Sequence, residues 1–330
     1  MNFPKISIIT PSFNQGKYIE QTILSVINQN YPNLEYIIID GGSTDETVEI
    51  IKKYEKHITF WLSEQDRGQS HAINKGLQKA TGELFNWLNS DDYLKNRALF
   101  DIAEKYLTNK NPDVICGFTH CFFEETGKTS HIYRMGIKKN PARTITNVEM
   151  NQPGTFYNLQ KIKKLGGVNE SLNYIFDDEL WFRFLSEYGQ KNIVLSDKIY
   201  VNFRLHGTSK SVHDGFEKFL KERNTVYLKM SEQMNLPDFI IKKLSNENNV
   251  NYYKTNNWDF KNLDKEQFEA WFCNKYQYNF YKDFKYKEAE YCVKKVIRFH
   301  NFSLNIKFIS LFVKLFLIPS KMFWKITDYI

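Results

Sequence analysis

Two pairs of neighbouring aspartates are the residues of this chain best suited to chemistry. Asp91 and Asp92 lie in the stretch WLNSDDY, shortly after an apolar run, and Asp177 and Asp178 lie in YIFDDELWFR. Neighbouring carboxylates repel each other, so a fold keeps them together only for a reason. For Asp91 and Asp92 that reason is either a metal ion, which prefers hard oxygen ligands, or a solvated turn or helix cap.

The elements that position these carboxylates alternate between strand-like and helix-like segments. The strand-like runs are residues 6–10, 34–40, 58–62 and 84–88. Residues 18–28 and 69–79 show helical spacing, and the capping box Ser43-x-x-Glu46 predicts the start of another helix. This alternation predicts an α/β fold in which helices cover both faces of a mostly parallel sheet.

Polar and glycine-rich residues follow each predicted strand. They are TPSFN from residue 10, DGGS from residue 40, EQDRGQS from residue 64 and NSDD from residue 89. In such sheets ligands bind beyond the carboxyl ends of the strands. The sequence contains neither G-x-G-x-x-G nor G-x-x-x-x-G-K-[ST], so dinucleotide and P-loop sites lose their main support.

The second half of the chain is less regular and then becomes helical. Residues 113–121 and 198–205 are strand-like, and residues 152–156 read as a loop that enters a strand. Helices are predicted over 216–234, 236–246 and 265–300.

Charge and composition separate the two halves. Residues 1–214 hold 25 Lys and Arg and 25 Asp and Glu, whereas residues 215–330 hold 20 and 13. The four cysteines show no metal-binding spacing, which favours a reducing compartment. No signal peptide and no run of about 20 apolar residues is evident. We therefore expect a cytoplasmic protein.

Several ordered motifs resemble glycosyltransferase family 2. They are ISIITPSFNQGKYIEQTILSVINQNYPNLEYIIIDGGSTDETVEII, DRGQSHAINKGLQKATGELFNWLNSDD, YIFDDELWFR and RLHGTSKS, which together span roughly residues 4–212. The resemblance implies a GT-A fold and an inverting transfer from a nucleotide-diphosphate sugar, with a UDP-sugar expected. It also implies a saccharide or lipid-linked saccharide acceptor. The family's processive members carry Gln-x-x-Arg-Trp and spanning helices, which are not evident here, so we expect transfer of a single sugar.

The resemblance assigns a set of residues to the donor nucleotide: Thr10, Pro11, Ser12, Asn14, Asp40, Arg67, Gln69, Lys75, Asn89 and Ser90. Asp40 matches the family's uracil or ribose contact. The alternative for Asp40 is a turn-forming aspartate before two glycines, and Arg67 and Lys75 could equally be surface charges.

The family's Asp-x-Asp metal motif falls on Asn89 and Asp91. The resemblance therefore implies that Asp91 binds Mg²⁺ or Mn²⁺, which would neutralise the donor diphosphate, with Asp92 in support. Asn89 departs from the motif and predicts weaker metal affinity. His206 resembles a metal- or phosphate-contacting histidine of some relatives, and a structural role is the alternative.

Asp177 takes the position of the family's catalytic aspartate. An inverting transfer needs one base to deprotonate the acceptor hydroxyl, and a single carboxylate suffices. Phe176 stands where the family commonly has Glu, and it could raise the pKa of Asp177 by excluding water. The alternative for Asp177 is helix capping. Asp178 is expected to be a charge at the N-terminus of a helix, where the helix dipole stabilises it, and Arg183 is expected to pair with neighbours of Asp177.

The last 27 residues, 304–330, read as an apolar helix that Pro319 would kink or split. Its lysines fall on one helical stripe: Lys307, Lys314, Lys321 and Lys325. Such a helix suits an anionic membrane surface, and the alternative is packing against residues 216–300 or an oligomer contact. No nucleic-acid-binding motif is recognisable.

We therefore expect a catalytic domain at residues 1–214, a helical extension at 215–303 and a basic amphipathic helix at 304–330. The expected protein is a metal-dependent glycosyltransferase of surface-polysaccharide or glycolipid synthesis, peripheral on the inner face of the cytoplasmic membrane. Two rivals stay open: a sugar nucleotidyltransferase, which would release pyrophosphate, and a non-catalytic sugar-nucleotide-binding or scaffold protein. Retention of both Asp91 and Asp177 argues against the second.

Overall fold

A nine-stranded sheet forms the N-terminal half of the computed structural model, which describes residues 3–207, 209–210, 216–247, 258–299 and 306–316. The strand order is β3-β2-β1-β4-β8-β6-β9-β5, and β7 lies off this path and pairs with β6. The strands are β1 (Ile6–Ser12), β2 (Leu34–Asp40), β3 (Phe60–Ser63), β4 (Leu84–Trp87), β5 (Tyr93–Leu94), β6 (Val114–Phe123), β7 (Thr129–Tyr133), β8 (Thr155–Asn158) and β9 (Ile193–Leu205).

The first four strands are parallel and the rest of the sheet is mixed. β1 lies between β2 and β4 and is parallel to both, with Ile8 opposite Tyr36 and Asn86. β3 extends this block in parallel beside β2. β8 runs antiparallel to both β4 and β6, and β9 is parallel to β6. The α/β fold class is therefore confirmed, but the expected mostly parallel sheet holds only for its first half.

Helices cover both faces of the sheet because the strands are apolar on both sides. Ile8 and Ile38 belong to one buried cluster, and their neighbours Ile9 and Ile39 belong to the other. The first cluster is covered by α1 (Gly16–Ile27), α2 (Thr47–Lys53) and α4 (Ala98–Thr108). The second is covered by α3 (Gln69–Lys79), α5 (Pro141–Thr146), α6 (Leu159–Lys164) and α7 (Phe176–Tyr188).

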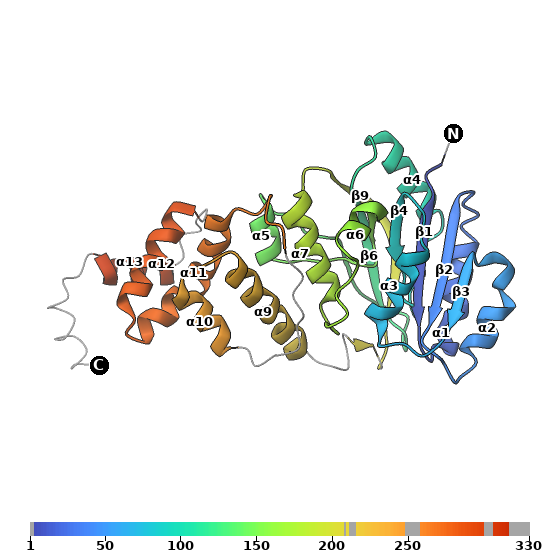
Figure 1. Cartoon of the computed structure of the whole chain (residues 1–330), viewed down its shortest axis with the longest axis horizontal. Coiled ribbons are helices and arrows are strands. Elements are labelled where there is room, and N and C mark those ends of the chain that lie inside the picture. Colours follow the sequence, from blue (N-terminus) through green and yellow to red (C-terminus); the bar gives the residue numbers. More distant parts are fainter. Residues whose placement is uncertain (1–2, 208, 211–215, 248–257, 300–305, 317–330) are drawn as a thin grey trace.

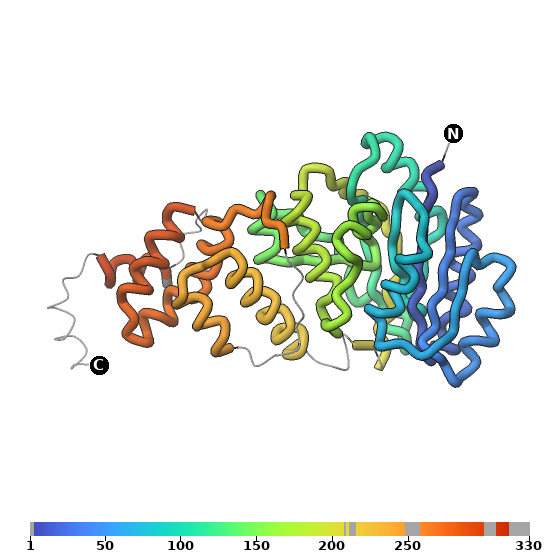
Figure 2. Tube along the Cα trace, viewed as in Figure 1, coloured from blue at the N-terminus to red at the C-terminus, as the bar shows by residue number. Residues whose placement is uncertain are grey.

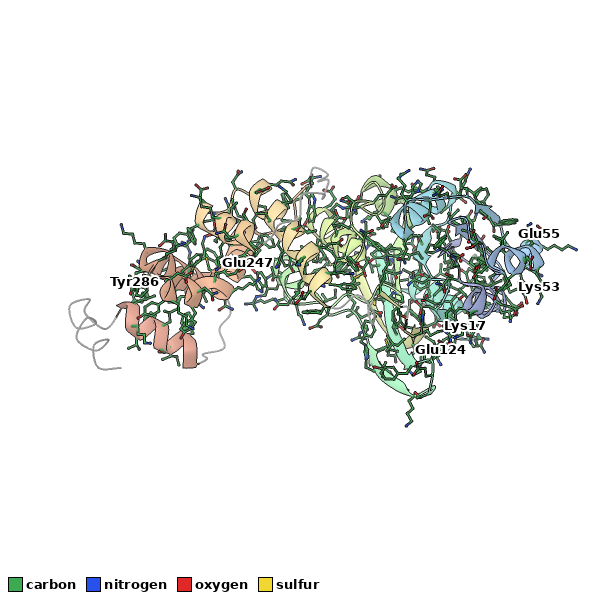
Figure 3. The ribbon with its side chains drawn as sticks, turned by 90° about the horizontal axis from the view of Figure 1, so that it is seen from below. Lys17, Lys53, Glu55, Glu124, Glu247 and Tyr286 are labelled. Carbon is green, nitrogen blue, oxygen red and sulfur yellow. The ribbon has the colours of Figure 1, made fainter. Side chains whose placement is uncertain are left out.

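The β6–β7 hairpin projects from the sheet (Figure 3). In the turn between the two strands, the Glu124 carboxylate accepts a hydrogen bond from the Tyr18 hydroxyl at 2.7 Å and lies 2.8 Å from the Lys17 ammonium. These contacts tie the hairpin to the start of α1, next to the carboxyl end of β1.

The C-terminal helices extend the molecule away from the sheet (Figures 1 and 2). They are α9 (Phe216–Gln233), α10 (Asp238–Asn246), α11 (Lys265–Lys282), α12 (Tyr286–Phe299) and α13 (Ile306–Phe316). Their buried side chains belong to the same hydrophobic cluster that covers one sheet face through α7. The Tyr227 ring of α9 stacks on Phe182 of α7 at 5.7 Å, so the extension and the sheet share one continuous core.

Several local predictions need correction. The helix predicted over 265–300 is two helices, because the chain reverses at Phe284, whose φ is +57°. The predicted capping box is wrong, since the Ser43 hydroxyl bonds to Asp40 and α2 begins only at Thr47. All four cysteines are free and buried.

Only the first part of the predicted helix 304–330 lies within the described residues. α13 ends at Phe316, and residues 317–330 lie outside them. Phe308 and Leu311 are buried in the shared core, whereas Ile309 is 44% exposed. One side of α13 therefore packs against the preceding helices, as the alternative for this segment predicts. Within the described chain, no helix is both long and apolar enough to cross a bilayer.

Candidate active site

A pocket of about 750 Å³ lies at the carboxyl ends of the parallel strands, where the sequence predicts a ligand site. One wall comes from residues at or just after the carboxyl ends of β1, β2, β3 and β4, such as Ser12, Gly41, Asp66 and Ser90. The facing wall comes from the start of α7, the end of β9 and Phe219 of α9. The pocket therefore lies between the parallel half of the sheet and the segments that lead into the helical extension.

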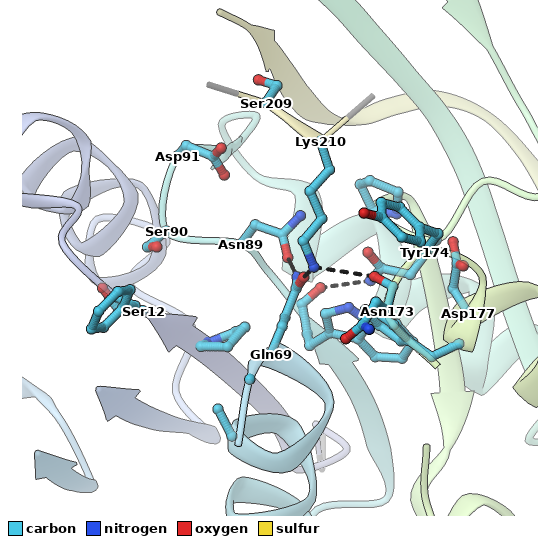
Figure 4. Close-up of a pocket in the computed structure, with 18 of the residues that line it drawn as sticks. Ser12, Gln69, Asn89, Ser90, Asp91, Asn173, Tyr174, Asp177, Ser209 and Lys210 are labelled. Atoms are coloured by element: carbon cyan, nitrogen blue, oxygen red, sulfur yellow. Dashed lines mark hydrogen bonds between the residues drawn. The ribbon is translucent and has the colours of Figure 1, made fainter. Parts of the chain in front are cut away.

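The two acidic pairs meet at this pocket. Asp91 and Asp177 both line it, whereas their neighbours Asp92 and Asp178 do not. Figure 4 shows Asp91 and Asp177 on opposite sides, with Gln69 and Lys210 between them. The fold thus brings together one carboxylate from each pair, although they are separated by more than 80 positions in the sequence.

Asp91 forms a pair with His206. Its Oδ2 lies 3.0 Å from the His206 Nε2, and its side chain is 21% exposed. The His206 ring is buried against Tyr18, with the ring centroids 4.8 Å apart. This packing fixes the imidazole with one nitrogen directed at Asp91.

Asp92 is buried beneath Asp91 and holds the turn together. Its Oδ1 accepts the Arg204 backbone N–H at 3.0 Å, and its Oδ2 accepts the Asn89 side-chain amide at 3.3 Å. Burial, and then the neighbouring Asp91 carboxylate, raise the pKa of Asp92 well above its ordinary value. Asp92 is therefore placed to fix the shape of the turn rather than to contact a ligand.

Asp177 lies in the first turn of α7 with its carboxylate partly exposed to the pocket. Burial, and then the nearby Asp178 carboxylate, raise its pKa to about 7, against the opposing effect of backbone N–H groups at the helix start. Phe176 is buried beside it, and its ring lies 6.2 Å from Trp87. A carboxyl group with this pKa can take up and release a proton near neutral pH.

Asp178 points away from the pocket into an ion pair with α9. Its Oδ2 accepts from the Arg223 Nε at 3.0 Å and from Nη2 at 2.6 Å. Burial raises the pKa of Asp178, and the Arg223 guanidinium opposes that rise. Arg183 pairs with Glu179, a neighbour of Asp177, and donates to the carbonyls of Leu165 and Gly167, so its role is to hold α7 in place.

A chain of polar contacts links the two sides of the pocket. The Lys210 ammonium donates to the Gln69 Oε1 at 3.2 Å and to the Asn173 carbonyl at 3.1 Å. Gln69 in turn donates to the Asn89 Oδ1 at 2.8 Å. A cationic group therefore lies between the Asp91 and Asp177 sides, where a negatively charged ligand group would be stabilised.

Half of the predicted donor residues line the pocket: Pro11, Ser12, Gln69, Asn89 and Ser90. Among the described residues, the buried Ser12 hydroxyl and Gln15 Oε1 have no hydrogen-bond partner. Buried polar atoms without partners are unusual, so this end of the pocket has unused capacity for polar contacts.

Three of the predicted donor residues, Thr10, Asn14 and Asp40, lie outside the pocket lining. Asp40 is fully buried, and its carboxylate accepts hydrogen bonds from Ser63 and from the backbone of Gly42. Gly42 has a φ of +86°, which the tight turn after β2 requires. Thr10 is buried beside Tyr36, and Asn14 is bonded to the loop that precedes α2. Asp40 thus makes the hydrogen bonds of the turn-forming alternative, and its contact with the donor stays a prediction.

Arg67 and Lys75 also lie outside the pocket lining. The Arg67 guanidinium is exposed and lies 2.6 Å from the Glu170 carboxylate. The Lys75 ammonium lies 2.8 Å from Glu64. Both side chains are thus in ion pairs outside the pocket lining, and their contact with the donor stays a prediction.

Other residues of the pocket lining were not predicted as site residues. Lys210 lies inside the quoted motif RLHGTSKS, so that motif could have indicated it. Asp66 lies inside DRGQS and lines the pocket near Gly41. Tyr174 opens the quoted motif YIFDDELWFR, whereas Asn173 and Phe219 stand in no motif and only the fold brings them to the site. A further part of the lining comes from Gln65, Tyr133, Met150, Gln152 and Phe203.

The residues around Asp91 fit a divalent cation that shares its ligands with a bound diphosphate. Mg²⁺ and Mn²⁺ are commonly held by one or two carboxylates plus phosphate oxygens. Asp91 and His206 supply two protein groups, and the Asn89 side chain is engaged by Gln69 and Asp92. Across the described residues no group of three or more His, Cys, Asp and Glu side chains could hold a metal. Any ion here would therefore depend on ligand oxygens.

Comparison with known proteins agrees with this geometry. Residues 7–166 match the family described as glycosyl transferase family 2. An uncharacterized glycosyltransferase of Rickettsia typhi is 29% identical over 259 residues, which cover 72% of this chain and 79% of the relative. The GalNAc(5)-diNAcBac-PP-undecaprenol beta-1,3-glucosyltransferase of Campylobacter jejuni is 32% identical over 42% of this chain and 45% of its own length.

A solved structure shares the fold. The crystal structure of S. aureus TarS in complex with UDP matches with a TM-score of 0.55 and 21% identity, over 82% of this chain and 71% of that one. This likeness shows the fold, which is that of a GT-A-type glycosyltransferase. Because the sequence match, the fold and the pocket agree, the chain belongs to glycosyltransferase family 2 and is a glycosyltransferase.

Proposed function

We propose that this protein transfers one sugar, with inversion, from a nucleotide-diphosphate sugar to a saccharide or lipid-linked saccharide in surface-polysaccharide or glycolipid synthesis. The observation that carries the proposal is the placement of Asp91 with His206 on one side of a single pocket and Asp177 on the other. Such a site can hold a diphosphate at one end and activate a hydroxyl group at the other.

The donor is proposed to lie along the ends of β1 to β4, with its diphosphate beside Asp91, His206 and Lys210. Ser12 and Gln15 offer buried polar atoms to the nucleoside. A UDP-sugar is the proposed donor, supported by the UDP complex of TarS, a protein with the same fold. The C. jejuni relative is named for a polyprenyl-diphosphate-linked acceptor, which supports an acceptor of that class.

Asp91 and His206 are proposed to hold Mg²⁺ or Mn²⁺. The ion would neutralise the diphosphate and so make it a better leaving group. Asp92 and Asn89 support this role by fixing the turn, because both are hydrogen-bonded within it. With two protein ligands, affinity for the ion is expected to be low until the nucleotide binds.

Asp177 is proposed to be the general base. Its pKa of about 7 lets the ionised carboxylate accept the proton of the acceptor hydroxyl at neutral pH. The oxygen then bonds to the anomeric carbon while the bond from that carbon to the diphosphate breaks on the opposite side. The proton leaves on Asp177, and the electron pair leaves with the diphosphate. Base catalysis of this kind contributes about 10²- to 10⁴-fold to the rate.

A screen of nucleotide sugars tests the proposal. UDP-, GDP- and dTDP-sugars would be added with MnCl₂ to the full chain, first to find which of them raises the melting temperature. Release of the nucleoside diphosphate would then be measured with and without a polyprenyl-diphosphate-linked saccharide. We expect release that depends on a UDP-sugar and increases with the acceptor. Release of pyrophosphate would indicate a nucleotidyltransferase instead, and a failure of every nucleotide sugar to bind would refute the proposal.

We also propose that residues 304–330 bring the protein to an anionic membrane surface, beyond a catalytic domain at 1–214 and a helical extension at 215–303. The apolar sequence with its lysine stripe supports this, as does the exposure of Ile309 on α13. The test is flotation of the full chain with vesicles containing phosphatidylglycerol. Replacement of Lys307, Lys314, Lys321 and Lys325 by Gln should reduce binding, and equal flotation of both proteins would refute the role of these lysines.

A further inference from the structure

Glu222, a residue of the helical extension, binds the backbone that leads into α7. It is buried, with 1% exposure, and lies on α9. Its Oε1 accepts the Asn173 N–H at 3.0 Å, and its Oε2 accepts those of Tyr174 at 2.8 Å and Ile175 at 3.1 Å. One carboxylate therefore satisfies three successive backbone donors directly before Phe176 and Asp177. Buried N–H groups need acceptors, so this segment has a strong reason to keep its present shape.

Arg223, the next residue of α9, holds the other side of Asp177. Its guanidinium donates two hydrogen bonds to the Asp178 carboxylate, at 3.0 and 2.6 Å. The side chain of Asp178 is 7% exposed and that of Arg223 is 22% exposed. Two consecutive residues of α9 thus bind the chain on both sides of Asp177: Glu222 binds the backbone before it, and Arg223 binds the side chain after it.

The position of α9 itself is fixed by packing against α7 and α5. The Tyr227 ring stacks on Phe182 of α7, with the ring planes 13° apart. Its hydroxyl donates to the carbonyl of Ile145 in α5 at 2.8 Å. Phe219, one turn before Glu222 and Arg223, reaches the pocket and pairs with Tyr174 at 5.2 Å. The helix that carries Glu222 and Arg223, α9, is therefore held in place by its neighbours, and through Phe219 it forms part of the pocket wall.

We propose that Glu222 and Arg223 are positioning residues for Asp177, so that the helical extension builds part of the active site. The inference rests on the proposed role of Asp177 as the base. A base must lie within hydrogen-bond reach of the hydroxyl that it deprotonates, and a displacement of about 1 Å can cost on the order of 100-fold in rate. The three backbone hydrogen bonds accepted by Glu222 and the ion pair between Arg223 and Asp178 are the contacts that prevent such a displacement.

The charges around Asp177 agree with this role. Asp178 faces it from α7 and Arg223 from α9, while Tyr133 of β7 and Tyr157 of β8 are the nearby phenols. Burial raises the pKa of both phenols, so they are neutral at neutral pH. Arg223 therefore supplies the positive charge that offsets the buried negative charge of Asp178 beside the base.

Glu222→Gln is the primary test, with Glu232→Gln as the matched control. Gln keeps the shape of Glu222 but leaves only one oxygen to accept the three N–H groups. Glu232 lies on the same helix in an exposed ion pair with Lys229. For the nucleotide sugar that the screen identifies, we expect Glu222→Gln to lower kcat about tenfold or more while KM changes less than about threefold. The backbone amides of residues 173–175 should exchange hydrogen about tenfold faster, and the control should match wild type in all three measurements.

Arg223→Gln and Arg223→Lys keep the test decisive if Glu222→Gln does not fold. Gln removes the charge that pairs with Asp178, so Arg223→Gln should lower kcat about tenfold. Lys keeps that charge, so Arg223→Lys should retain most of the wild-type kcat. A kcat within twofold of wild type in both Glu222→Gln and Arg223→Gln would overturn the inference, as would equal losses in kcat and in affinity for the nucleotide sugar.

Failure of the proposed function would be recognised separately. If wild type releases no nucleoside diphosphate from any nucleotide sugar, the proposed function fails. Hydrogen exchange then still decides the positioning. Faster exchange confined to residues 173–178 in Glu222→Gln would support the positioning role of Glu222, and exchange at the wild-type rate would refute it.

Discussion

Asp91–Asp92 and Asp177–Asp178 are built alike, but the protein stabilises the buried member of each pair in a different way. In both pairs the first aspartate faces the pocket and the second is buried. Asp92 is held by amide donors from Arg204 and Asn89 within the sheet half of the molecule. Asp178 is held by the guanidinium of Arg223, which comes from the helical extension. The difference suggests separate tasks: the first pair shapes a binding turn, and the second tunes a reactive carboxylate.

The contacts of Asp91 and Asp177, the two aspartates that line the pocket, support the same division of tasks. Asp91 lies against a His206 nitrogen, so it already has a group with which to share a cation. Among the described residues, no side chain donates a hydrogen bond to Asp177, and burial raises its pKa to about 7. A metal ligand benefits from a carboxylate that stays ionised, whereas a base benefits from one that titrates near the working pH. Four substitutions test this contrast.

Asp177→Asn should have the largest effect. The amide keeps the size of the side chain but cannot accept the proton, so kcat should fall by about 10²- to 10⁴-fold. Binding of UDP with MnCl₂, measured by calorimetry, should stay within about twofold, because the diphosphate is proposed to bind on the other side of the pocket. An Asp177→Asn protein with full turnover would remove Asp177 as the base.

Asp91→Asn should act on binding instead. Loss of residues that merely support a metal ligand costs about 10- to 100-fold in metal affinity, so removing the ligand itself should cost at least that in Mn²⁺-dependent UDP binding. UDP binding measured in EDTA should be unaffected, which serves as the internal control. If Asp91→Asn and wild type bind UDP equally well with MnCl₂, the metal assignment is wrong.

Asp178→Asn should shift the pH dependence. It removes the negative charge that helps to raise the pKa of Asp177. The pKa of the base then falls, so activity is lost only at a lower pH than in wild type, by about one unit. The measurement is kcat against pH from 5 to 9, with Glu187→Gln, on the same helix but in contact with Lys261, as the matched control. An unchanged acidic limb would contradict the proposed coupling of the two carboxylates.

Lys210→Gln should have the smallest effect. The ammonium lies between the two aspartates and is proposed to face the diphosphate, but it is exposed to solvent. Binding of UDP should weaken about fivefold at low salt and by less at high salt, because exposed charges are screened. Lys229→Gln provides the control for loss of an exposed lysine. A loss that does not depend on salt would point to a structural role for Lys210.

The sequence predicts the position of the pocket better than its contacts. Strands β1 to β4 are short, continuous apolar runs, and polar residues follow each of them, so their carboxyl ends can be located from the pattern alone. Whether a side chain there faces the pocket depends on its hydrogen bonds. Asp40 ends a strand as expected, yet its carboxylate is used by Ser63 and by the turn through Gly42.

The second half shows where sequence patterns stop being informative. β8 runs antiparallel beside β4, although the chain between them gives no hint of that direction. Glu222 and Arg223 belong to a helix rich in charged residues, in which neither stands out. Their importance arises from contacts with residues almost 50 positions earlier in the chain, and such contacts exist only once α9 packs on α7.

The dependence of kcat on pH in the wild-type protein tests the central claim most directly. With the identified nucleotide sugar and a saturating acceptor, kcat should fall to half near pH 7 as Asp177 takes up a proton, and it should reach a plateau above that pH. In Asp178→Asn this midpoint should lie at a lower pH. A rate that stays constant between pH 5 and 8 would show that a carboxyl group with a raised pKa is not the base.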